Sequence, residues 1–186
     1  MMRSVVGLVI AVLGSWGVAF ADMPPPWSEF DIRSPNGHYL AEVRATQKPE
    51  GAPRWAWKYQ LTVFDTQPAR RQLLWSCDYT HDGYSNGFLS DDGYTFVYVN
   101  FWYEQDGPVV SLYRNGKKVG IVFGREFNVR DSALKSTVSH QMWLDELGSP
   151  NVRFIQRGPQ ALVLEITTID HKTHLISVES GKFVKP

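Results

Sequence analysis

The residues best suited to chemistry gather in one short stretch of the chain, residues 78–92. Four of them carry side-chain oxygens at spacings similar to the start of a calcium-binding loop: Asp78, Thr80, Asp82 and Asn86. Alternating oxygen ligands followed by a glycine, here Gly83, are typical of the first half of such a loop. An EF-hand is excluded, because its twelfth position is Leu89 instead of a bidentate Glu. Calcium is therefore one hypothesis, and the alternative is that Asp, Asn and Gly form two consecutive turns.

The same region also offers rings and acids that could hold an organic ligand. The candidate ligand-binding residues are Tyr79, His81, Asp82, Tyr84, Asp91, Asp92 and Trp102. Exposed aromatic rings can stack on sugar rings or on peptide side chains, and acids add polar contacts. The alternative is that most of these rings fill the core, because the chain has few other large side chains to do so.

No catalytic motif, phosphate loop or strong metal signature is present, which favours a non-catalytic protein. A hydrolase could still be assembled from three loop acids with either of two histidines as the base: Asp82, Asp91, Asp92, His81 and His140. Acids are also common in turns for structural reasons, which explains them equally well. We do not expect the adjacent Ser139 and His140 to act as nucleophile and base, because neighbouring side chains rarely face each other and no nucleophile elbow is present.

The first 21 residues have the pattern of a secretory leader. Arg3 supplies the positive start, residues 4–21 carry no charge, and Ala19-Phe20-Ala21 places small residues where a signal peptidase reads. An uncleaved membrane anchor is the alternative, but glycines dilute the apolar run and no basic cluster follows it. We therefore expect a signal peptide over residues 1–21 and export to the periplasm or the cell exterior.

The composition suits a single β-rich domain over residues 22–186. The chain has 19 Lys and Arg and 19 Asp and Glu, and only Arg3 lies in the leader, so the mature chain has one more acid than base. This balance does not attract nucleic acid or an anionic membrane, and no second apolar run has membrane length.

Cys77 is the only cysteine, which excludes an intramolecular disulfide, and its apolar neighbours favour a buried thiol.

Alternating apolar and polar side chains predict β-strands along the chain. Over residues 55–63 the odd-numbered side chains are apolar and predict a half-buried strand. Residues 94–103 are apolar on both faces, which predicts a central strand covered twice. Asn115-Gly116, between two apolar runs, predicts a two-residue hairpin turn.

A turn-and-strand pattern recurs at residues 34–41 (SPNGHYLA) and 90–97 (SDDGYTFV), with a degenerate third copy at residues 156–163 (QRGPQALV). Each copy precedes a hairpin, and so marks a unit of three or four antiparallel strands that needs neighbours to bury its face. The pattern resembles the turns of WD40-like and TolB-like β-propeller repeats. The resemblance implies about three propeller-like units, fewer than a closed ring needs. A partial propeller, a ring completed by assembly and a sandwich with similar turns all remain open.

The segment near residues 132–147 breaks the β rhythm. Asp131 or Ser132 could cap a helix there, and Gly148 with Pro150 could end it. We predict one short helix, or two turns, in this segment, docked on the sheets through His140 and Trp143.

The sequence thus predicts an all-β protein of antiparallel meander sheets, with propeller-like repeat units and one short helix. The favoured function is an exported, non-catalytic binding or assembly module for a protein or saccharide partner, with an oligomer as an open alternative. A hydrolase of envelope saccharide or peptide and a structural envelope protein are the other hypotheses. No cofactor is expected apart from the calcium considered above.

Overall fold

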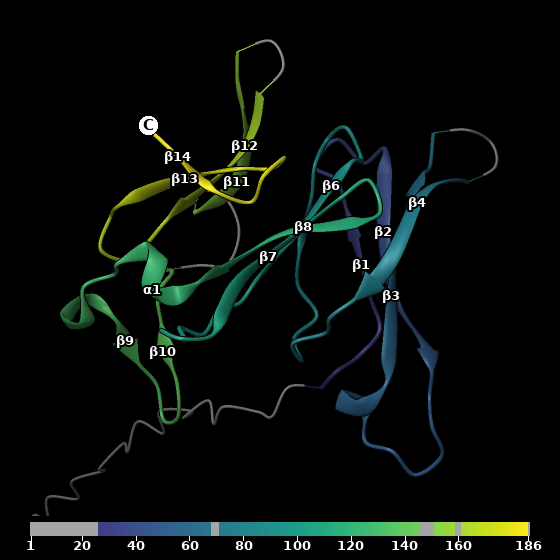
Figure 1. Cartoon of the computed structure of the whole chain (residues 1–186), viewed down its shortest axis with the longest axis horizontal. Coiled ribbons are helices and arrows are strands. Elements are labelled where there is room, and N and C mark those ends of the chain that lie inside the picture. The colour runs from purple at the N-terminus through teal and green to yellow at the C-terminus, as the bar shows by residue number, and fades with distance from the viewer. Residues whose placement is uncertain (1–25, 68–70, 146–150, 159–160, 186) are drawn as a thin grey trace, which may run out of the picture.

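Four antiparallel sheets follow one another along the chain in the computed structural model, which describes residues 26–67, 71–145, 151–158 and 161–185 (Figure 1). The first meander contains β1 (Phe30–Arg33), β2 (Tyr39–Gln47), β3 (Lys58–Asp65) and β4 (Gln72–Tyr79). The second contains β5 (Phe88–Leu89), β6 (Thr95–Val99), β7 (Pro108–Arg114) and β8 (Lys117–Phe123). The third contains β11 (Val152–Arg157), β12 (Ala161–Thr167), β13 (Thr173–Ser177) and β14 (Phe183–Val184). Between the second and third lies a hairpin of β9 (Lys135–Ser136) and β10 (Gln141–Met142).

Each four-stranded sheet pairs its strands in chain order. The first strand of every meander is therefore one edge of its sheet, and the last strand is the other edge. This arrangement confirms the predicted all-β fold of antiparallel meanders and its division into three similar units. The predicted signal peptide, residues 1–21, lies outside the described residues.

The second meander lies between the other two and is covered on both of its faces. All five residues of β6 are buried. Phe96 and Tyr98 belong to the cluster shared with the first meander, whereas Val97 and Val99 belong to the cluster shared with the third. The two-sided apolar pattern of residues 94–103 thus predicted the central strand correctly, although the strand itself is shorter.

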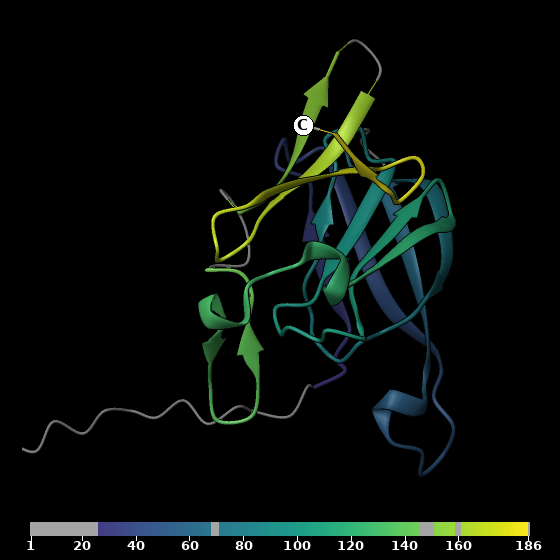
Figure 2. The same ribbon diagram turned by 60° about the vertical axis from the view of Figure 1, so that its left-hand side comes forward.

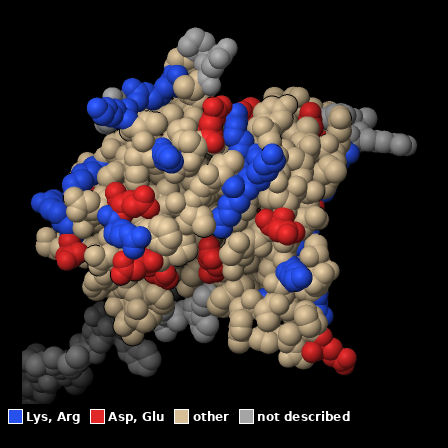
Figure 3. Space-filling model, in the orientation of Figure 1, with Lys and Arg blue, Asp and Glu red and all other residues tan. Residues whose placement is uncertain are grey.

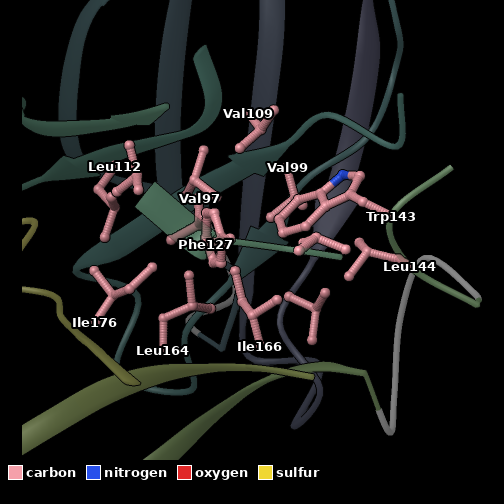
Figure 4. Close-up of a cluster of buried hydrophobic side chains, with 14 of the residues drawn as sticks. Val97, Val99, Val109, Leu112, Phe127, Trp143, Leu144, Leu164, Ile166 and Ile176 are labelled. Carbon is pink, nitrogen blue, oxygen red and sulfur yellow. The ribbon is translucent and has the colours of Figure 1, made fainter. Parts of the chain in front are cut away.

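Figure 4 shows how the second and third meanders pack together. Val97, Val99 and Val109 approach from one side, and Leu164 and Ile166 approach from the other. The side chains of the connecting segment lie between or beside these layers: Phe127, Trp143 and Leu144. Such a continuous buried cluster holds the two sheets together through the hydrophobic effect.

The segment near residues 132–147 is not the helix that its sequence predicts. It forms a 3-10 helix, η2 (Asp131–Ala133), and then the β9–β10 hairpin, and residues 146–147 lie outside the described part. The α-helix of the described residues, α1 (Gly124–Phe127), precedes this segment. Trp143 is fully buried and its Nε1 donates to the backbone O of Asn100 at 2.7 Å. Tertiary packing of Trp143 therefore overrides a weak helical pattern in a segment rich in Ser and Thr.

The strand predicted over residues 55–63 begins only at Lys58. Trp55 lies in a 3-10 helix, η1 (Arg54–Ala56), and 67% of its surface is exposed. The hairpin turn at Asn115-Gly116 is confirmed, because both residues have positive φ, 47° and 76°.

Acidic and basic side chains are interspersed on the face shown in Figure 3. None of the helices in the described part of the chain is long and apolar enough to cross a membrane.

Cys77 is half-buried in β4, and burial raises the pKa of its thiol to about 11. The thiol is therefore protonated at neutral pH, as expected for a cysteine that packs.

Candidate binding groove

The two repeat turns fold into the same hydrogen-bond network. In the first, Ser34 Oγ donates to Asn36 Oδ1 at 2.6 Å and accepts the N–H five residues later at 3.0 Å. In the second, Ser90 Oγ donates to Asp92 Oδ1 at 2.5 Å and accepts the equivalent N–H at 3.0 Å. The recurring sequence pattern therefore encodes one turn structure, used twice.

Asp91 joins these two turns to each other. Its Oδ1 accepts the backbone N–H of Asn36 at 2.8 Å, and its backbone O accepts the Asn36 side-chain amide at 2.8 Å. Trp75 Nε1 adds a further link between the first and second meanders by donating to the O of Gly93 at 2.9 Å. Asp91 and Asp92, both predicted as ligand contacts, thus have partners inside the fold.

His81 uses both of its ring nitrogens within the protein. Nδ1 accepts the N–H of Gly83 at 2.9 Å, which leaves the proton on Nε2, and Nε2 donates to the O of Ser28 at 3.0 Å. Three aromatic rings surround the imidazole, those of Phe30, Tyr59 and Tyr79. Burial lowers the pKa of His81 below its usual 6.5, so the ring is neutral at pH 7. His81 therefore fastens the segment before β1 to the loop after β4.

Three buried oxygens in this region find no hydrogen-bond partner among the described residues: Tyr79 Oη, Tyr98 Oη and Asn86 Oδ1. Asp82 interacts electrostatically with both tyrosines, and burial raises the pKa of its half-buried carboxyl. The other predicted calcium ligands, Asp78 and Thr80, are exposed. No cluster of three or more His, Cys, Asp or Glu suited to a metal occurs within the described ranges. Calcium binding here stays a prediction.

Of the predicted ligand-binding rings, Tyr84 and Trp102 come together with their centroids 6.4 Å apart. His140 stacks on Trp102 at 4.8 Å, and Ser139 Oγ lies 2.8 Å from His140 Nδ1. The expectation that Ser139 and His140 do not face each other is therefore wrong. Tyr79 is buried in the core cluster of the first meander, away from solvent.

A groove of about 770 Å³ lies where the first strands of the three meanders converge. Its lining comes from residues 32, 33 and 35 of the first meander, 87–89, 91 and 92 of the second, and 152–154, 156 and 162 of the third. Consecutive residues of the first and second meanders line it, whereas the face of a sheet contributes alternate residues. The edges of β1 and β5 therefore bound the groove, and the third meander borders it with β11 and, through Leu162, with β12.

The lining is mostly apolar, with a few charged side chains. Its apolar members are Ile32, Phe88, Leu89, Val152, Phe154 and Leu162. Arg153 is already paired, since its Nε donates to Glu165 Oε1 at 2.6 Å. Arg33 is exposed and has no ion-pair partner within the part of the chain that the structure describes. An apolar groove with one open cation is typical of a ligand site.

Sequence reasoning found only Asp91 and Asp92 among the groove residues. The signal that could have extended this set was the repeat itself. Arg33 and Leu89 each come directly before the serine of a repeat turn, so the two copies place them at equivalent positions. The contribution of β11 carried no such signal, because the third copy of the pattern is degenerate.

Comparison of the chain with models of protein families, with curated proteins and with solved structures finds no match. The resemblance to propeller-type repeats stays a prediction.

Proposed function

We propose that this chain is an exported, non-catalytic binding module that holds its ligand in the groove between the three meanders. The observation that carries the proposal is the groove itself. Its volume of about 770 Å³ is in the range of ligand sites, and three elements far apart in the chain build it. The two repeat turns follow β1 and β5 at the groove, and hydrogen bonds between Asn36 and Asp91 join these turns to each other. A preformed site on a rigid scaffold lowers the cost of binding.

The leader pattern of residues 1–21 supports a ligand outside the cytoplasm, a protein or a saccharide. The resemblance to propeller-type repeats supports the same function, since propeller-type scaffolds commonly serve recognition. The hydrolase hypothesis gains less support. His81 has both ring nitrogens bonded, and Asp91 and Asp92 hold the turns together.

Two defined probes test the proposal: a displayed library of random linear peptides and an array of envelope-type glycans. We expect one of them to yield a ligand for the purified protein. Arg33→Glu, at the groove, then weakens its binding by about tenfold or more, which corresponds to about 1.4 kcal/mol. Lys117→Glu is the matched control, since Lys117 is an exposed cation outside the groove lining. Equal binding by both variants, or no ligand from either probe, would contradict the proposal.

A further inference from the structure

We infer that the groove takes an extended polypeptide segment, which pairs as an added strand with the free edge of β11. The inference rests on the proposed function and names the ligand class of the same site. Among the described residues, β11 pairs with β12 alone. β11 has six residues, against four in β1 and two in β5, so it offers the longest template at the groove. Figures 1 and 2 both show the β11–β12 hairpin extending beyond the rest of the fold.

Hydrogen bonds beside β11 show which of its backbone groups lack a partner. Thr167 N–H donates to the O of Asn151 at 2.8 Å, which makes these residues a hydrogen-bonded pair of the antiparallel ladder. Such pairs alternate along two antiparallel strands, so the odd-numbered residues of β11 bond to β12. The bond from Thr168 N–H to the O of Lys172, 2.9 Å long on the other side of β12, gives the same alternation.

The even-numbered residues of β11 therefore turn their N–H and C=O groups away from β12. All three of these residues line the groove, together with Arg153: Val152, Phe154 and Gln156. None is a proline, so each offers both a donor and an acceptor. Val152 is only 2% exposed, so the donor–acceptor pairs within reach of a ligand are those of Phe154 and Gln156.

The edges of the other two meanders contribute to the same groove. The serine of each repeat turn donates its N–H across the turn, at 3.1 Å in the first meander and 2.9 Å in the second. By the same alternation, Arg33 in β1 and Leu89 in β5 turn their backbone groups away from their own sheets. Both residues line the groove, where Arg33 is exposed and Leu89 is buried, so the first strands of all three meanders border it.

A polypeptide has the chemistry that matches these walls. The unpaired groups of a strand edge recur at every second residue, about 7 Å apart, and an extended peptide repeats its own donors and acceptors at the same interval. A saccharide has no such repeat of N–H donors. Strand addition gives each edge group a partner, while alternate side chains of the peptide enter the apolar part of the groove.

Charge limits which segment can pair here. β11 carries Arg153 and Arg157 and no acid, whereas the groove lining as a whole combines Arg33 and Arg153 with Asp91 and Asp92. Opposite charges on paired strands are stabilising and like charges are not. The segment is therefore apolar at the alternate positions that enter the groove, and acids stabilise it only where they face the arginines of β11. A second copy of β11 is disfavoured, because it would bring two further arginines to the same edge.

The test uses the peptide selected on the purified protein from the random library, measured against two variants at one position. Gln156→Pro removes the outward N–H and leaves the bonds to β12 in place, since proline is tolerated at an open strand edge. Gln156→Ala is the matched control, because it removes the same side chain and keeps the N–H. We expect Gln156→Pro to weaken binding by about tenfold or more and Gln156→Ala to change it by less than about threefold.

Amide exchange provides a second measurement that does not depend on the folding of the proline variant. In the unaltered protein, the selected peptide should slow exchange at Phe154 and Gln156 and leave Ile155 and Arg157 unchanged, because the latter two are already bonded to β12.

The outcomes separate this inference from the proposed function. Equal binding by the two Gln156 variants, together with loss of binding by Arg33→Glu, overturns strand addition and keeps the binding groove. If the protein selects glycans and no peptide, strand addition is likewise overturned and the binding groove is kept. A peptide that binds Arg33→Glu and Gln156→Pro as well as the unaltered protein overturns both.

Discussion

The loop of residues 78–92 and the groove meet at residues 87–92, but they use polar groups in opposite ways. In the loop, the side chains of His81, Asp91 and Asp92 are bonded within the protein. In the groove, the backbone edges of β1, β5 and β11 face outward without a strand partner among the described residues. A dense run of polar residues can therefore mark a place where hydrogen bonds stabilise the fold instead of a ligand site. The site that can bind a ligand is made of backbone from three distant segments.

The largest expected effect tests the structural role of the loop. His81→Ala removes two hydrogen bonds and the packing of the ring against three aromatic side chains, so we expect the free energy of unfolding to fall by about 2–4 kcal/mol. His140→Ala is the control, because the ring of His140 stacks on the half-buried Trp102 and contacts the exposed Ser139 Oγ, and the loss of these contacts should cost less than about 1 kcal/mol. Urea unfolding of both variants measures the difference. Similar losses of unfolding free energy in the two variants would contradict the structural role of His81.

The second prediction compares the two repeat turns. Ser90→Ala leaves the N–H of the fully buried Thr95 without its side-chain acceptor, and we expect a loss of about 1–3 kcal/mol. Ser34→Ala removes the same contact from Tyr39, which is only half-buried, and should cost about 1 kcal/mol. Thermal melting of the two variants shows which substitution causes the larger loss of stability. The reverse order would show that burial does not set the cost of these turns.

Sequence reasoning predicted the central strand and the turns because local side-chain chemistry determines both. Phe96 and Val97 point to opposite faces, and apolar side chains at both positions require a layer on each side. The segment near residues 132–147 was predicted wrongly, because the burial of Trp143 depends on two meanders that are distant in sequence. The groove could not be predicted, since a free strand edge consists of backbone groups that every residue type carries.

The third prediction concerns pH. Burial lowers the pKa of His81, so the unfolded chain binds a proton at higher pH than the folded protein does. Stability is therefore complete above the unfolded value of 6.5 and falls as the pH drops below it, by at most about 1.4 kcal/mol per pH unit for one proton. His174 contributes with the same sign, because burial lowers its pKa too.

Chemical unfolding at several pH values between 5 and 7 checks this dependence. His81→Gln should flatten the curve and leave only the slope that His174 produces. An unchanged slope in His81→Gln would mean that His81 is as easily protonated in the folded protein as in the unfolded chain.

The smallest expected effect separates the loop from the groove as a ligand site. Burial raises the pKa of Asp82, so its charge is unfavourable in the folded protein, and Asp82→Asn should raise the free energy of unfolding by a few tenths of a kcal/mol. Binding of the selected peptide should be unchanged in Asp82→Asn and in Tyr84→Ala. If the loop holds the ligand, both variants lose binding without losing stability, and the groove is not the site.

The most direct test of the central claim is amide hydrogen exchange along β11 in the free protein, resolved residue by residue by NMR. We expect alternation, with fast exchange at Phe154 and Gln156 on the open edge and slow exchange at Ile155 and Arg157, which bond to β12. Uniformly slow exchange along the strand would contradict it, because the edge would then already be covered and unable to receive a ligand.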